Sequence, residues 1–285
     1  MRLFNRAISS LAHLAALPLL LIAALSVPAG AEEVRMPMPY QLGLQDPVSP
    51  VGVRIGEFHD FLLWLIFAIS VFVLALLVYV CFRYRASANP NPSRTSHNTM
   101  IEILWTAVPV IILVVVAIPS FKNLYYLDRA VDPDMTIKVI GNQWYWSYEY
   151  PDEELVFDSY MLEGEDLQKA NGTRMLDVDN PLVVPTGKKI QVLVTSNDVF
   201  HSFFVPSAVV QIYAVGGRTN ETWMQFDKEG TFYGQCNQIC GIRHAYMPIV
   251  VKALNEADYA EWLKGAKEEF AMNRDAPVRV AVNAN

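Results

Sequence analysis

The stretch FLLWLIFAISVFVLALLVYVCF, residues 61–82, runs for 22 residues without a charged side chain. About 20 apolar residues in a helix, at 1.5 Å each, cross a hydrocarbon core of roughly 30 Å. A second uncharged stretch of 19 residues, ILWTAVPVIILVVVAIPSF, covers residues 103–121. Its two prolines are compatible with a membrane helix, because neighbouring helices can satisfy the freed backbone groups. The two stretches predict a transmembrane helical hairpin over residues 57–122.

The loop between the two spans indicates the orientation of the hairpin. It contains Arg83, Arg85 and Arg94 and no acidic residue before residue 102. Loops rich in Arg and Lys stay in the cytoplasm. We therefore expect residues 123–285 on the outer face of a bacterial inner membrane, in the periplasm.

The N-terminal segment gives the same topology independently. Two arginines precede the apolar run LAHLAALPLLLIAAL, and the small-residue sequence AGA ends at Ala31. This order is typical of a signal peptide, here residues 1–31 with cleavage after Ala31. A retained membrane helix is the alternative, and the prolines and the AGA ending favour cleavage. Residues 32–56, rich in Pro, Met and Gly, are predicted to be a periplasmic linker.

The outer part of the chain has the pattern of a β domain. Short runs rich in Val, Ile and aromatic residues alternate with Gly, Pro, Asn and Asp, which predicts an antiparallel sandwich or barrel over residues 123–254. In the run TIKVIGNQWYWSYEY, residues 136–150, strand alternation would direct the Trp and Tyr side chains at 144, 146, 148 and 150 to one face. Residues 255–285 are predicted to be a helix capped by Asn255, followed by a tail.

Charge and cysteine content narrow the range of functions. Residues 123–285 contain 23 acidic residues and 14 Lys and Arg residues, which gives this part a formal net charge of −9. Such a surface repels nucleic acid and suits a basic protein partner. The chain has 3 cysteines, too few for a disulfide framework.

The stretch GQCNQICGIRHAYMPIVV, residues 234–251, gathers two thiols, an imidazole and a thioether. Soft donors of this kind favour copper over magnesium or calcium, and the upstream His201 offers a second imidazole. Structural zinc or a Cys236–Cys240 disulfide remain alternatives, although neither uses the methionine. A single blue-copper ion needs only one thiolate. The donor count fits two copper ions bridged by both sulfurs.

Three segments resemble the cytochrome c oxidase subunit II family: GQCNQICGIRHAYMPIVVKA with His201 upstream, GNQWYWSYEY with FDSYML, and NTMIEILWTAVPVIIL. The resemblance covers about residues 50–270. It implies two transmembrane helices followed by a cupredoxin-like Greek-key β-barrel. It also implies a subunit that takes electrons from cytochrome c at a dinuclear copper-A centre and passes them to haem in subunit I. There oxygen is reduced to water with proton pumping, beside a subunit III; this chain has no oxygen site of its own.

The resemblance assigns roles to individual residues. It implies that Cys236 and Cys240 bridge two copper ions as thiolates and that His201 and His244 each bind one of these ions. The Met247 thioether and the Gln238 backbone carbonyl would be weak ligands. Trp144 would be the electron-entry residue and Glu102 would lie at the entrance of a proton channel into subunit I. A set of acids would receive the lysines of cytochrome c: Glu149, Asp152, Asp158, Asp179 and Asp198.

Several positions depart from the family pattern. Gln238 stands where the family has a Glu that helps to bind magnesium beside subunit I, and it offers an oxygen but no charge to that second site. Asn142 replaces a frequent His, and residues 213–218 read YAVGGR. Two other classes of protein differ from this pattern. A quinol oxidase subunit II lacks the copper ligands, and a copper-delivery protein would have one membrane anchor and no Met247.

Overall fold

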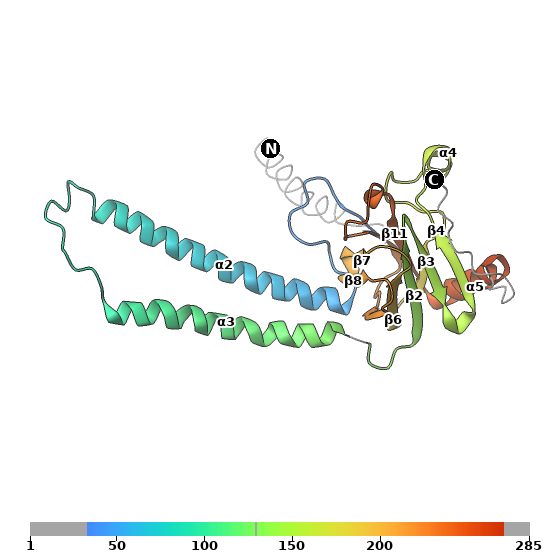
Figure 1. The fold of residues 1–285 in the computed structure, drawn as a ribbon, viewed down its shortest axis with the longest axis horizontal. Coiled ribbons are helices and arrows are strands. Elements are labelled where there is room, and N and C mark those ends of the chain that lie inside the picture. The colour runs from blue at the N-terminus through green and yellow to red at the C-terminus, as the bar shows by residue number, and fades with distance from the viewer. Residues whose placement is uncertain (1–32, 129, 271–285) are drawn as a thin grey trace, which may run out of the picture. The chain divides into compact units, whose positions relative to one another are not determined.

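The computed structural model describes residues 33–128 and 130–270, so the predicted signal peptide and the end of the predicted tail lie outside the described residues. Two long helices, α2 (Pro50–Arg83) and α3 (Thr99–Asp128), run side by side and are joined by a loop (Figure 1). Both are long and apolar enough to cross a membrane, and no other described part of the chain covers their most apolar windows. This confirms the predicted pair of transmembrane helices.

Helix α2 begins at Pro50, seven residues before the predicted start of the hairpin at residue 57. Hydropathy identifies the part of a helix that lies in lipid, whereas capping determines where the helix starts. The Ser49 hydroxyl accepts a hydrogen bond from Gly52 N at 2.8 Å, and Pro50 occupies the first turn. The same hydroxyl donates to the Ala208 carbonyl at 2.8 Å. The cap therefore also connects α2 to the β domain.

The β domain is built mainly from two sheets. The first has the order β1-β10-β11-β5, the second has the order β4-β3-β2-β6-β9, and β7 and β8 form a separate pair. Their bounds are β1 (Glu33–Arg35), β2 (Met135–Asn142), β3 (Tyr145–Tyr150), β4 (Leu155–Ser159), β5 (Leu182–Pro185), β6 (Ile190–Ser196), β7 (His201–Val205), β8 (Val210–Ala214), β9 (Asn220–Met224), β10 (Gly230–Gln235) and β11 (Pro248–Leu254). Short helical segments are α4 (Gly164–Lys169), η1 (Pro151–Glu153), η2 (Pro206–Ala208) and η3 (His244–Tyr246).

The sheets are mixed, which corrects the expectation of a purely antiparallel domain. Strand β2 pairs in parallel with β6, and β5 pairs in parallel with β11. Parallel neighbours need long connections, and here β3, β4, α4 and β5 all lie between β2 and β6 in the chain. Local patterns of alternation do not record which distant strand becomes the neighbour. Side chains from both sheets meet in one buried core.

The aromatic run at residues 136–150 forms two strands, where the sequence pattern predicts one. Strands β2 and β3 form an antiparallel hairpin in which Asn142 pairs with Tyr145, so Gln143 and Trp144 make the turn. The predicted alternation holds beyond the turn, because Trp146, Tyr148 and Tyr150 are all buried. Trp144 is only half-buried, since a turn residue is not constrained to the core face. The hairpin therefore brings one indole out of the core beside the metal-ligand loop.

Helix α5 (Glu256–Phe270) closes one side of the domain. Asn255 caps it, as predicted, by accepting hydrogen bonds from Ala257 N and Asp258 N. The Trp262 ring packs against Tyr150 with ring centroids 5.7 Å apart. Trp262, Leu263 and Phe270 of the helix thus pack against the buried core.

Candidate metal centre

Five side chains with soft or borderline donor atoms, and one backbone carbonyl, come together between β7, β10 and β11. Cys236 and Cys240 lie on the loop after β10, and their sulfur atoms are 3.9 Å apart. The Nδ1 atom of His201, the first residue of β7, is 3.9 Å from the Cys236 sulfur. His244 in η3 directs its Nδ1 to within 3.5 Å of the Cys240 sulfur. Each sulfur thus has one imidazole nitrogen beside it.

Two weaker donors complete the cluster. The Met247 sulfur lies 3.6 Å from the Cys240 sulfur, and the Gln238 carbonyl oxygen lies 3.3 Å from the Cys236 sulfur. All six predicted ligand residues are therefore adjacent. Within the described residues, His201, Cys236 and Cys240 are the group of His, Cys, Asp or Glu that could hold a metal ion. A cluster of two thiols, two imidazoles and a thioether matches copper by the softness of its donors.

The ligand residues differ in burial. His201 is fully buried, and Cys236, Cys240 and Met247 are 7%, 4% and 1% exposed. His244 and Gln238 are half-buried. Gly141 makes the burial of His201 feasible, because a Cβ there would lie 2.8 Å from the imidazole Cδ2. The sulfurs are thus shielded from solvent while one imidazole lies near the surface.

The protonation of the copper-free thiols is uneven. Burial raises the pKa of the Cys236 thiol, but hydrogen bonds from His201 and backbone groups outweigh burial and leave this pKa below its ordinary value. Burial and the neighbouring Cys236 raise the pKa of Cys240 to about 12. Burial lowers the pKa of His201, but its contacts with Cys236 and Asp198 leave that pKa raised. Metal ligation must therefore displace a firmly held proton from Cys240.

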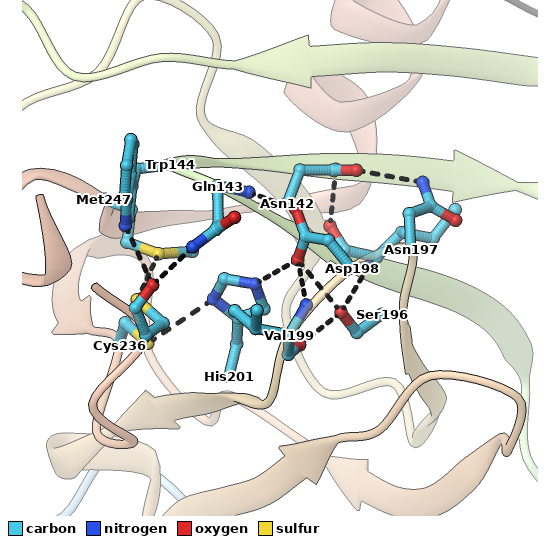
Figure 2. A network of polar contacts seen from close by, with 12 residues as sticks. Asn142, Gln143, Trp144, Ser196, Asn197, Asp198, Val199, His201, Cys236 and Met247 are labelled. Carbon is cyan, nitrogen blue, oxygen red and sulfur yellow. Dashed lines mark hydrogen bonds and ion pairs between the residues drawn. The ribbon is translucent and has the colours of Figure 1, made fainter. Parts of the chain in front are cut away.

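The β2–β3 turn is hydrogen-bonded to the ligand loop, the segment after β10 that carries Cys236 and Cys240 (Figure 2). The side-chain amide of Gln143 and the indole N–H of Trp144 both donate to the Cys240 carbonyl, at 2.8 and 3.2 Å. Two residues after Trp144, the indole N–H of the buried Trp146 donates to the Met247 carbonyl at 3.2 Å. The aromatic stretch and the cysteine loop are therefore one hydrogen-bonded unit. The family resemblance singled out Trp144, but nothing in the sequence indicated the roles of Gln143 and Trp146, because these depend on contacts across about 100 residues.

The predicted docking acids have different surroundings. Glu149 forms an ion pair with Lys138 at 2.9 Å, and Asp152 is exposed in η1. Asp158 accepts from the Ser147 hydroxyl at 2.6 Å, and Asp179 accepts from the backbone N–H of Tyr160 and Asn180. Asp198 lies closer to the ligands, because it accepts a 2.7 Å hydrogen bond from His201 Nε2.

Glu102 lies in the first turn of α3, far along the chain from this cluster. It is half-buried, and its carboxylate accepts a hydrogen bond from Asn98 N at 3.3 Å. It also lines a cavity of about 390 Å³ with Thr99, Ile103, Thr106 and Ala107. This environment is that of a helix cap beside an open surface cavity.

Comparison with known proteins covers both parts of the chain. Residues 37–123 match the family described as the cytochrome c oxidase subunit II transmembrane domain, and residues 135–254 match its periplasmic domain. The chain is 47% identical over 238 residues to a probable cytochrome c oxidase subunit 2 of Rickettsia bellii, covering 83% of this chain and 88% of the relative. It is 47% identical over 244 residues to cytochrome c oxidase subunit 2 of Phytophthora megasperma, covering 84% and 91%.

Among solved structures, the periplasmic domain of cytochrome oxidase subunit II from Bradyrhizobium japonicum is 46% identical to this chain. That comparison has a TM-score of 0.46 and covers 50% of this chain and 99% of the solved domain. The two family matches and the relatives agree over the transmembrane hairpin and the β domain alike. The chain belongs to the cytochrome c oxidase subunit II family.

Proposed function

We propose that this oxidase subunit receives electrons from cytochrome c at a dinuclear copper centre and delivers them to haem in subunit I. The observation that carries the proposal is the pair of sulfur atoms 3.9 Å apart, each with its own imidazole Nδ1 at 3.9 or 3.5 Å. A copper pair held there would supply one-electron chemistry. Donors in excess of what one ion needs favour two ions over one.

The proposed ligands follow from the donor set. Cys236 and Cys240 would hold the metal ions as thiolates, and His201 and His244 would each bind through Nδ1. The Met247 thioether and the Gln238 carbonyl would be the weak ligands. Burial of both sulfurs and the hydrogen bonds from the β2–β3 turn support a site that is held rigid, which suits repeated gain and loss of an electron.

Trp144 is the proposed point of electron entry. It is half-buried, so one part of its ring can contact a partner, and its N–H bonds to the carbonyl of a proposed copper ligand. A flat indole offers a large contact area at a docking surface. Opposite charge would steer a basic cytochrome c to this region, with the docking set comprising Glu149, Asp152, Asp158, Asp179 and Asp198.

Magnesium is not part of the proposal. Gln238 offers an uncharged amide oxygen where a hard divalent cation prefers carboxylates, so the side chain present does not fit that ion. Glu102 remains the proposed entrance of a proton channel, since it combines an ionisable group with a surface cavity at the end of a membrane span. The partners are subunits I and III, and the expected location is a bacterial inner membrane with the β domain in the periplasm.

Copper counting on the purified full-length chain, reconstituted in detergent, tests the proposal. We expect two copper ions per chain and the paramagnetic resonance spectrum of one electron shared equally between two copper nuclei. Cys240→Ser should reduce the content to fewer than two ions and abolish the shared-electron spectrum. A colourless protein that holds zinc, or one copper ion at saturation, would overturn the proposal in favour of a structural or copper-delivery role.

A further inference from the structure

The carboxylate of Asp198 forms hydrogen bonds through both oxygens in the loop between β6 and β7 (Figure 2). Its Oδ1 accepts from His201 Nε2 at 2.7 Å and from Val199 N at 2.6 Å, and it lies 3.3 Å from the Ser196 hydroxyl. Its Oδ2 accepts from Gln143 N at 2.7 Å. The side chain is 32% exposed. Most of its acceptor capacity is therefore used inside the protein.

The first oxygen determines how His201 can act as a ligand. A neutral imidazole has one N–H and one lone pair, and the hydrogen bond at one nitrogen selects the tautomer. Because Nε2 faces the carboxylate, the N–H is expected there, and the lone pair lies on Nδ1, which faces Cys236. Carboxylates that hold a ligating histidine in this way orient the ring and increase its donor strength.

The second oxygen holds the β2–β3 turn. Gln143 N is the backbone group immediately before Trp144, and both residues donate through their side chains to the Cys240 carbonyl. One carboxylate therefore connects a proposed ligand, His201, to the turn that carries the proposed electron-entry residue. None of the other proposed docking acids has a contact with a ligand side chain among the described residues.

We propose that Asp198 is a positioning residue, which fixes His201 as an Nδ1 ligand and fixes the Trp144 turn over the cysteine loop. This role is distinct from electrostatic docking of the donor and rests on the proposed function. The contacts with His201 and Gln143 distinguish Asp198 from Asp152, an exposed acid of the same charge on η1.

Two substitutions at position 198 separate geometry from charge. Asp198→Asn removes the charge and places an amide where the N–H donors converge. Asp198→Glu keeps the charge but moves the carboxylate by one methylene. We expect both variants to weaken copper binding by about 10- to 100-fold, to shift the reduction potential of the centre and to alter its copper hyperfine spectrum. Asp198→Glu should retain the wild-type dependence of cytochrome c reduction on ionic strength.

Asp152→Asn is the matched control, measured in the same purified oxidase. It should change the dependence on ionic strength while the copper affinity, potential and spectrum stay as in the wild type. The proposal is overturned if Asp198→Glu leaves copper affinity, potential and spectrum unchanged, or if Asp198→Asn behaves like Asp152→Asn. Copper content of the wild-type chain tests the dinuclear centre separately, so failure of the proposed function is recognised before the variants are compared.

Discussion

At the scale of single residues, Gly241 shows how closely the turn and the ligand loop approach each other. A Cβ at this position would lie 2.9 Å from Cζ2 of Trp144 and 3.2 Å from Nε2 of Gln143, and the backbone has a φ of +120°. We expect Gly241→Ala to destabilise the domain by about 1–3 kcal/mol and to displace the Trp144 ring. Denaturant unfolding and the rate of reduction by cytochrome c measure the two effects.

Gly265 in α5 is the matched control, because a Cβ there would meet no atom within 4 Å. Ala is favoured over Gly inside a helix, so Gly265→Ala should stabilise the chain by about 0.5–1 kcal/mol. Its reduction rate should stay at the wild-type value. Equal effects of the two substitutions would contradict the proposed contact between residue 241 and the Trp144 ring.

The donor types and their spacing were enough to select the five side chains of the metal cluster, whereas the Gln238 carbonyl was implied only by the family resemblance. Cys236, Cys240 and His244 recur at intervals of four, so a single loop brings them together. The double role of Asp198 could not be predicted, since it depends on where Gln143, 55 residues earlier in the chain, is folded back. The sign available in the sequence was an Asp three residues before a candidate ligand.

At the scale of elements, hydropathy and alternation identified the spans and most strands but not their ends or their neighbours. Helix α2 starts outside the apolar stretch because Ser49 caps it, and the run at residues 136–150 contains a turn because Gln143 and Trp144 bend the chain. Parallel pairing of β2 with β6 brings together strands separated by five other elements. Such pairings depend on the packing of the whole domain, which a local pattern does not contain.

The junction between α3 and β9 gives a prediction at this scale. The Trp223 indole donates to the Tyr126 carbonyl at 2.9 Å, the two rings meet edge to face, and Arg54 of α2 lies 3.8 Å over the Tyr126 ring. Trp223→Phe removes the hydrogen bond, which is worth about 1 kcal/mol. We expect roughly fivefold faster amide hydrogen exchange in the last turn of α3.

Trp64→Phe provides the comparison for that measurement. Trp64 is 71% exposed on α2, within the predicted membrane span, and contacts Phe67 of its own helix. Its substitution should leave exchange at the end of α3 unchanged. Faster exchange in both variants would mean that loss of an indole, and not of the α3–β9 contact, loosens the helix.

At the scale of the whole molecule, buried tyrosines predict the response of the β domain to alkaline pH. Burial raises the pKa of Tyr148 and of Tyr150 well above the ordinary value of 10. The folded state therefore favours the neutral phenols, and their contribution to stability is complete below pH 10. It is lost as the pH rises above 10, where the unfolded chain ionises first, at about 1.4 kcal/mol per pH unit for each tyrosine.

Tyr148→Phe tests this response, because the ring is retained and the ionisable hydroxyl is lost. The free energy of unfolding of the copper-free chain should fall between pH 10 and pH 11 by about 1 kcal/mol less in this variant than in the wild type, because the unfolded tyrosine is only half ionised at pH 10. Tyr40→Phe, at a fully exposed side chain, should keep the wild-type slope. An identical slope in Tyr148→Phe would show that other groups control alkaline unfolding.

The proposed docking acids predict that charge controls the rate of association with cytochrome c, and the Lys138–Glu149 ion pair allows the direction of this effect to be tested. The two side chains are 34% and 27% exposed, and together they add no net charge to the field that a basic cytochrome c meets. Glu149→Gln leaves the lysine and should slow association at low ionic strength, whereas Lys138→Met leaves the carboxylate and should accelerate it, each by roughly two- to threefold. The double variant should return close to the wild-type rate.

These differences in association rate should vanish near 1 M salt, where the screening length is about 3 Å. Stopped-flow reduction by cytochrome c across ionic strength measures them, and a change of the same direction in both single variants would point to altered packing of β2 and β3 instead of altered charge.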